Sequence, residues 1–127
     1  MSNSTNTKRI LLVDDNKDMT ILLSKLLEYY GYSVKVANDG MTALEIAREF
    51  KPEIVLLDIG MPVMDGYETS RLLLSQKNKE DKMVLVAISG YGQEEDFNKS
   101  KEAGFSYHLV KPVGIDELVK VIENISF

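Results

Sequence analysis

Residues 54–66 read IVLLDIGMPVMDG, and this stretch decides the fold. Four consecutive apolar residues run into Asp58, and a short loop then leads to Asp65 and Gly66. A continuous apolar run between polar turns is typical of a strand that is buried on both faces of a parallel sheet. An aspartate placed just before a helical pattern is a common helix start. The stretch therefore predicts a buried strand, a loop and a helix, in that order.

The same order of strand and helix recurs on both sides of this stretch. The predicted strands cover residues 10–13, 34–37, 54–57, 84–88 and 109–110. The first helix carries an apolar stripe made of Met19, Leu22, Leu23, Leu26, Leu27 and Tyr30, with Gly31 as its C-cap. The second begins at Asp39 and ends before Pro52, the third begins at Asp65-Gly66, the fourth ends at Gly104, and the fifth covers residues 115–125. Five strands alternating with five helices predict an α/β fold with a parallel sheet covered on both faces.

Length and composition limit the class of protein. The 127 residues are enough for one domain, predicted at residues 8–127 after a disordered lead at residues 1–7. The absence of cysteine excludes a disulfide scaffold and a thiolate metal site. A net charge of -5 argues against direct binding to nucleic acid. Neither a membrane-length apolar run nor a signal-peptide pattern is present, so we expect a cytoplasmic protein without membrane insertion.

Polar side chains end four of the predicted strands. They are Asp14 and Asp15 after the first strand, Asp58 after the third, Ser89 after the fourth and Lys111 after the fifth. Because the carboxyl ends of parallel strands meet at one edge of the sheet, we expect these side chains to converge. Crowded carboxylates repel one another and need a counterion, and their oxygen atoms suit Mg²⁺. A carboxylate nucleophile, a metal and a lysine are what phosphoryl transfer to an aspartate requires.

Three stretches carry a family resemblance. Residues 10–15 (ILLVDD), 55–66 (VLLDIGMPVMDG) and 110–112 (VKP) resemble the signatures of response-regulator receiver domains, and the likeness covers residues 8–126. This resemblance implies a flavodoxin-like, doubly wound (βα)5 fold with the strand order 2-1-3-4-5. It also implies a partner, either a sensor histidine kinase or a histidine phosphotransfer protein, that donates a phosphoryl group from phosphohistidine.

The resemblance also implies a role for each site residue. Asp58 is the phosphoacceptor, Asp15 binds Mg²⁺ directly, Asp14 helps to hold it through water, and the backbone carbonyl of Gly60 completes the protein ligands. Lys111 contacts the phosphoryl group, and Ser89 moves to bond it. The face formed by the fourth helix, fifth strand and fifth helix then changes shape, and the Lys111–Pro112 bond is cis. Such a domain catalyses its own phosphorylation and dephosphorylation but is not a turnover enzyme.

Two positions depart from the common pattern of the family. His108 stands three residues before Lys111, where most members carry an aromatic switch residue, and Tyr107 faces the opposite side of the strand. We expect inward movement of His108 on activation to favour its neutral form. Gly60 stands where many relatives carry a side chain that shapes access of water to the acceptor.

Other interpretations fit the sequence less well. Any one of these polar residues alone would be an ordinary solvated loop residue. A phosphatase of the haloacid-dehalogenase type needs an Asp-x-Asp pair after one strand, whereas Asp14 and Asp15 are adjacent and Asp58 lies on another strand. A flavodoxin would place a phosphate where Asp14 and Asp15 put negative charge. Within the receiver family, a free single-domain regulator and a receiver from a hybrid histidine kinase both remain open.

Overall fold

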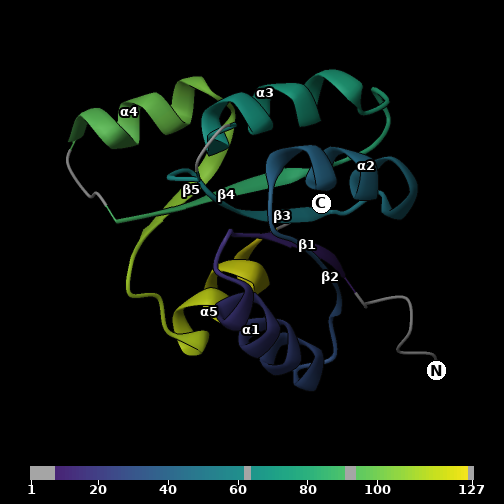
Figure 1. The fold of residues 1–127 in the computed structure, drawn as a ribbon, viewed down its shortest axis with the longest axis vertical. Coiled ribbons are helices and arrows are strands. Elements are labelled where there is room, and N and C mark those ends of the chain that lie inside the picture. Colours follow the sequence, from purple (N-terminus) through teal and green to yellow (C-terminus); the bar gives the residue numbers. More distant parts are fainter. Residues whose placement is uncertain (1–7, 62–63, 91–93, 126–127) are drawn as a thin grey trace.

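Five parallel strands form one sheet in the order β2-β1-β3-β4-β5 in the computed structural model (Figure 1). They are β1 Arg9–Val13, β2 Ser33–Ala37, β3 Ile54–Asp58, β4 Val84–Ser89 and β5 Phe105–Val110. The structure describes residues 8–61, 64–90 and 94–125, and the predicted lead at residues 1–7 lies outside these ranges. The flavodoxin-like strand order implied by the family resemblance is confirmed.

The fifth strand is longer than the sequence predicted. We expected residues 109–110, whereas β5 spans Phe105–Val110. Its first half alternates between buried Phe105 and exposed Ser106, as in a strand with one solvated side, instead of forming a continuous apolar run. β5 lies at an edge of the sheet and pairs only with β4 among the strands described. Its apolar sequence pattern is therefore weaker than that of the central strands.

Five helices connect and follow the strands, and side-chain caps fix the starts of the first three. They are α1 Lys17–Tyr29, α2 Gly40–Phe50, α3 Gly66–Gln76, α4 Glu94–Glu102 and α5 Ile115–Asn124. The side chains of Asn16, Asp39 and Asp65 accept hydrogen bonds from backbone N–H groups in the first turns of α1, α2 and α3. Gly31 and Gly104 end helices at φ of +97° and +100°, where a side chain would be strained.

The helices cover the sheet in two layers. Figure 1 shows α2, α3 and α4 on one face and α1 and α5 on the other. Successive residues of the central strands alternate between these faces: Leu11 and Leu57 join the core under α2 and α3, while Leu12 and Leu56 join the core under α1 and α5. Each fully buried leucine stabilises the fold by about 1.5–3 kcal/mol, so both cores fix the sheet from which the site projects.

Two members of the predicted apolar stripe of α1 are wrong. Leu22 and Tyr30 are 58% and 47% exposed, whereas Thr20, outside the stripe, is buried. The hydroxyl of Thr20 donates to the carbonyl of Lys17 and accepts from the amide of Asn38, so its buried position costs no unpaired polar group. Within the described ranges, none of the helices is both long and apolar enough to cross a membrane.

Candidate functional site

Three carboxylates meet where β1 and β3 end. These strands are neighbours in the sheet, which places Asp14 and Asp15 beside Asp58 although they are far apart in sequence. One oxygen atom from each carboxylate lies within 4.8 Å of the others. Asp14 and Asp58 are buried, whereas Asp15 is exposed at the rim. The cluster therefore opens to solvent on the side of Asp15.

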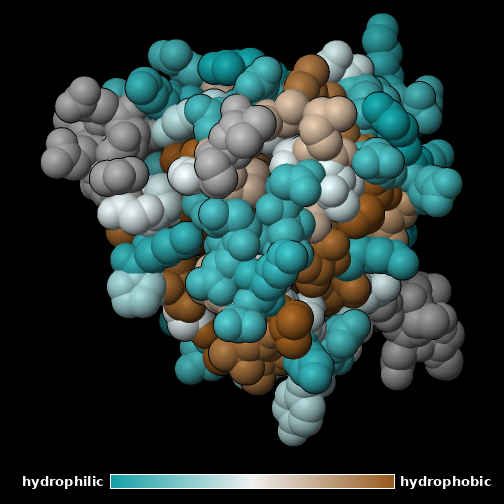
Figure 2. Space-filling view, in the orientation of Figure 1, coloured by the Kyte–Doolittle hydropathy of each residue, from teal (hydrophilic) through white to brown (hydrophobic). Residues whose placement is uncertain are grey.

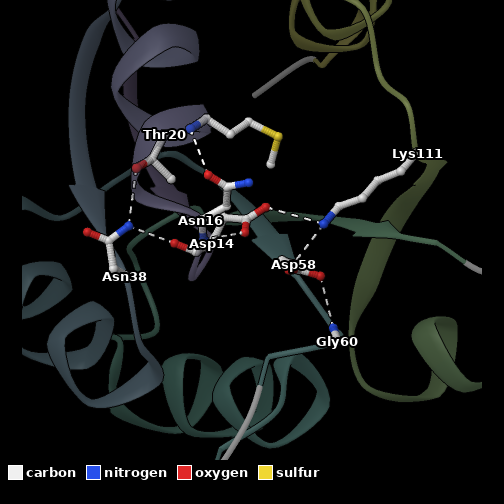
Figure 3. Close-up of polar contacts among 8 residues, drawn as sticks. Asp14, Asn16, Thr20, Asn38, Asp58, Gly60 and Lys111 are labelled. Atoms are coloured by element: carbon white, nitrogen blue, oxygen red, sulfur yellow. Dashed lines mark hydrogen bonds and ion pairs between the residues drawn. The ribbon is translucent and has the colours of Figure 1, made fainter.

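Lys111 reaches this cluster from the end of β5 (Figure 3). Its Nζ lies 3.3 Å from Oδ2 of Asp58 and 3.5 Å from Oδ2 of Asp14. The backbone N–H of Gly60 donates to the other oxygen of Asp58, Oδ1, at 2.9 Å. One oxygen of Asp58 is thus held by the backbone, and the other faces the lysine. The bond from Lys111 to Pro112 is cis, as predicted.

Burial and charge together shift the proton affinities of the site. Burial raises the pKa of Asp14, and the charge of Asp58 raises it further against the opposing hydrogen bond from the Asn16 N–H. Burial lowers the pKa of Lys111, but the charges of Asp14 and Asp58 outweigh this and hold it above its usual value. Three carboxylates face a single ammonium, so negative charge remains uncompensated. An all-oxygen donor set with this excess fits a hard divalent cation such as Mg²⁺.

Asn38, which the sequence analysis missed, holds the loop that carries two of these carboxylates. Its amide nitrogen donates to the backbone carbonyl of Asp14 at 2.7 Å and to the hydroxyl of Thr20 at 3.1 Å (Figure 3). Asn38 directly follows β2, and this place at the carboxyl end of a strand is the signal that identifies it. The residue therefore ties the loop after β1 to α1.

Gly66 fixes the loop after the acceptor strand. A Cβ at this position would overlap the backbone of Ile59 and would approach the carbonyl oxygen of Asp58 to 2.8 Å. Only glycine allows α3 to start so close to the end of β3. A Cβ at Gly60, in contrast, would lie 3.6 Å from Oδ1 of Asp58, an ordinary contact.

Ser89, at the end of β4, lies beside His108 of the neighbouring strand β5. Oγ of Ser89, which is buried, lies 2.7 Å from Nε2 of His108. Nδ1 of the same ring lies 3.0 Å from Oγ of Ser100, a buried residue of α4 that the sequence analysis also missed. Tyr107 packs on the opposite face with the core of α1 and α5, as predicted. His108 thus already contacts Ser89 in this structure, instead of pointing away from it.

Apolar side chains are exposed on the first half of α1. Ile21 and Leu22 of α1 are 53% and 58% exposed. Figure 2 shows apolar side chains gathered over α1 and α5 on the lower part of this face. A surface of this kind can receive an apolar face of another protein.

Known proteins share both the sequence pattern and the fold. Residues 10–123 match the model of the response regulator receiver domain. The chain is 35% identical over 117 residues to sporulation initiation phosphotransferase F of Bacillus subtilis, covering 92% of each chain. Several other curated relatives are longer, and the chain spans about half of their length.

Solved structures agree with this match. The chemotaxis protein CheY4 of Vibrio cholerae superimposes with a TM-score of 0.86 at 26% identity, covering 94% of this chain and 99% of that one. The receiver domain of a sensor histidine kinase from Pseudomonas aeruginosa gives a TM-score of 0.79 at 28% identity, covering 92% and 95%, and holds a magnesium ion in its active site cleft. The chain therefore belongs to the response regulator receiver domain family, the phosphoacceptor modules of two-component signalling.

Proposed function

We propose that Asp58 accepts a phosphoryl group from a phosphohistidine of a sensor histidine kinase or a histidine phosphotransfer protein. The observation that carries this proposal is the contact of Lys111 with Asp58 inside a cluster of three carboxylates. In the transfer, the bond between phosphorus and the donor's ring nitrogen breaks and a bond from phosphorus to a carboxylate oxygen of Asp58 forms. The released imidazole takes up a proton from solvent.

The residues around Asp58 have separate tasks. Asp14, Asp15, Asp58 and the carbonyl of Gly60 would hold Mg²⁺, which when bound neutralises negative charge on the phosphoryl oxygens. The N–H of Gly60 fixes the plane of the acceptor carboxylate. Lys111 sits between two carboxylates and can follow the phosphoryl oxygens as charge builds on them.

With this site the protein acts as a molecular switch and not as an enzyme that turns over many substrate molecules. Each chain carries the phosphoryl group on its own Asp58, so the protein is the substrate of the reaction that its residues promote. Ser89 would bond the phosphoryl group, and its movement would alter the surface made by α4, β5 and α5. The proposal implies a cytoplasmic location, because histidine kinases draw on cytoplasmic ATP.

Intact-mass measurement with acetyl phosphate and Mg²⁺ tests the proposal. The wild type should gain the mass of one phosphoryl group, and Asp58→Asn should gain none. Asp116→Asn, which changes an exposed carboxylate in the first turn of α5, serves as the matched control and should react like the wild type. An equal gain in Asp58→Asn would remove Asp58 from this role.

We propose further that the donor protein docks on the first half of α1. Ile21 is exposed in the half of α1 that follows the acidic loop after β1, and Met19 is half-buried two residues earlier. An exposed apolar side chain such as that of Ile21 can be buried by a helix of a partner protein. Ile21→Ala combined with Met19→Ala should slow phosphotransfer from the donor roughly tenfold while leaving the reaction with acetyl phosphate unchanged.

The other end of α1 supplies the control for this test. Tyr29 is 87% exposed and lies at the end of the helix farthest from the cluster. Tyr29→Ala should leave both reactions at the wild-type rate. If the double variant transfers as fast as Tyr29→Ala does, the donor docks elsewhere.

A further inference from the structure

Three side chains form a hydrogen-bonded line from the end of β4 to α4. The line runs from Ser89 through the ring of His108 to Ser100, with separations of 2.7 Å at Nε2 and 3.0 Å at Nδ1. Both serines are buried, and the ring lies half-buried between them. Asp58 and Ile88 are register partners in the sheet, so Ser89 ends its strand one residue beyond, at the edge that carries the acceptor. The line therefore begins at the edge of the sheet that carries Asp58 and ends on a helix.

The protonated nitrogen of the imidazole ring decides which group donates in each hydrogen bond of this line. A neutral ring has one N–H donor and one bare nitrogen acceptor, and the two tautomers exchange these roles. With the proton on Nε2, the ring donates to Ser89 and accepts from Ser100. With the proton on Nδ1, every bond of the line is reversed. Both tautomers satisfy these two hydrogen bonds, so neither of the two bonds by itself fixes the tautomer.

A phosphoryl group on Asp58 removes this equivalence. A serine hydroxyl has one proton, and if Ser89 gives it to Nε2 of His108 that proton is not available to a phosphoryl oxygen. Only the tautomer with the proton on Nε2 lets Ser89 accept from the ring and donate to the phosphoryl group at the same time. In that state Ser100 has to donate to Nδ1, because the bare nitrogen can only accept.

We propose that His108 is a positioning residue that directs the hydroxyl proton of Ser89 toward the phosphoryl group and reports this direction to α4 through Ser100. This rests on the proposed phosphorylation of Asp58. Phosphorylation shifts the tautomers of His108 toward the form protonated on Nε2, and the hydroxyl of Ser100 turns to match. No net proton is gained or lost, since the ring exchanges one proton between its nitrogens through solvent.

The tautomer ratio of His108 can be measured without interference, because His108 is the only histidine in the sequence. In ¹⁵N-labelled protein, the two imidazole nitrogen signals report which nitrogen carries the proton. We would record them at pH 8, above the ordinary pKa of histidine of about 6.5, with Mg²⁺ and with or without beryllofluoride as the phosphoryl mimic. A hydrogen bond to a charged group should move the tautomer ratio toward Nε2–H by about tenfold or more.

Two variants separate the relay from general effects of the bound mimic. Ser89→Ala cannot pass a proton to the mimic, so its tautomer ratio should be the same with and without beryllofluoride. Ser70→Ala is the matched control: Ser70 is also buried and donates to the carbonyl of Ala103 at 3.0 Å, close to α4 but outside the line. It should keep the wild-type change in the ratio.

The outcomes distinguish this inference from the proposed function. An unchanged ratio in the wild type with beryllofluoride bound, a ring protonated on both nitrogens, or a wild-type response in Ser89→Ala would each overturn the relay while leaving Asp58 as the acceptor. If beryllofluoride perturbs the wild type no more than it perturbs Asp58→Asn, the proposed acceptor itself is wrong, and the relay fails with it.

Discussion

At the scale of single residues, Asp14 carries a charge that the folded domain disfavours without a cation. Burial, followed by the charge of Asp58, raises its pKa above the ordinary value of 3.8. The folded state therefore binds the carboxyl proton of Asp14 more tightly than the unfolded chain does. The metal-free domain loses stability as the pH rises from 3.8 through the raised pKa of folded Asp14. At neutral pH the ionised Asp14 is a cost to the fold.

The upward shift in the pKa of Asp14 can be tested on the metal-free protein. Asp14→Asn should have a larger free energy of unfolding than the wild type at pH 7, measured in the presence of a chelator. The gain should shrink as the pH falls through the raised pKa of folded Asp14 toward 3.8, and it should vanish below 3.8, where the wild-type carboxyl is neutral in both states. A variant that is less stable at pH 7 would mean that the contact with Lys111 outweighs burial.

Asp15 differs because it lies exposed at the rim of the cluster. Asp15→Ala should weaken Mg²⁺ binding strongly, whereas the stability of the metal-free domain should hold or rise, because one of three repelling charges is gone. Titration with Mg²⁺ followed by NMR and thermal unfolding in a chelator measure the two effects. Asp18→Ala, an exposed acidic residue in the first turn of α1, should change neither. Normal Mg²⁺ affinity in Asp15→Ala would exclude it as a ligand.

The charged residues at the ends of the predicted strands were sufficient to predict the acidic cluster and its lysine. Asp14, Asp58 and Lys111 meet as the sequence led us to expect. Asn38 and Ser100 were not predicted, because their importance lies in hydrogen-bond geometry and not in a charge or a nucleophile. A side chain of this kind looks like any other polar residue until its partners are known.

At the scale of elements, the loop after β1 depends on β2 and α1. Asn38→Ala removes the donor to the carbonyl of Asp14, so the loop should lose its fixed shape and Mg²⁺ affinity should fall about tenfold. Gln76→Ala is the matched control, since Gln76 donates to the carbonyl of Leu44 at 2.9 Å, away from the site. Both variants should lose about 1–3 kcal/mol of stability. Equal Mg²⁺ affinities in the two would remove Asn38 from the site.

The turn between α1 and β2 is tied to α5 by one hydrogen bond. The hydroxyl of Tyr32 donates to Glu123 at 3.0 Å. Burial, followed by this contact with Glu123, raises the pKa of Tyr32 from 10.0 to about 12. The folded state holds the proton longer than the unfolded chain does, so this contribution to stability is complete below pH 10 and is lost as the pH rises toward 12.

Tyr32→Phe isolates that contribution from other alkaline titrations. The difference in unfolding free energy between the wild type and Tyr32→Phe should be constant below pH 10 and should fall between pH 10 and 12. Chemical denaturation at a series of pH values measures it. A difference that stays constant across this range would show that Tyr32 titrates alike in both states.

Apolar patterning predicted the central strands better than it predicted β5, one of the two edge strands. β1 and β3 are covered on both faces and read as continuous apolar runs, so their positions could be predicted within one residue. The first half of β5 alternates instead, and the side chains of Ser106 and His108 interrupt the pattern. The exposed Leu22 of α1 was wrongly assigned to the core for a related reason, because Thr20 takes a buried place through hydrogen bonds.

At the scale of the whole molecule, the alternation of strands and helices was enough to predict a parallel sheet with two helical layers. The strand order came from the family resemblance, because local periodicity does not encode which strands become neighbours. That order matters for function: with β1 between β2 and β3, the acidic loop lies beside the acceptor strand and within reach of Asn38.

The central claim is that Asp58 becomes an aspartyl phosphate in a reaction that depends on Mg²⁺. Borohydride reduces an acyl phosphate to an alcohol, so it converts phosphorylated aspartate to homoserine and marks the site permanently. After reaction with acetyl phosphate, reduction and peptide sequencing by mass spectrometry, we predict homoserine at position 58 in samples with Mg²⁺ and none in samples with a chelator. Homoserine at position 14 or 15 in place of 58, or equal labelling without Mg²⁺, would contradict the account.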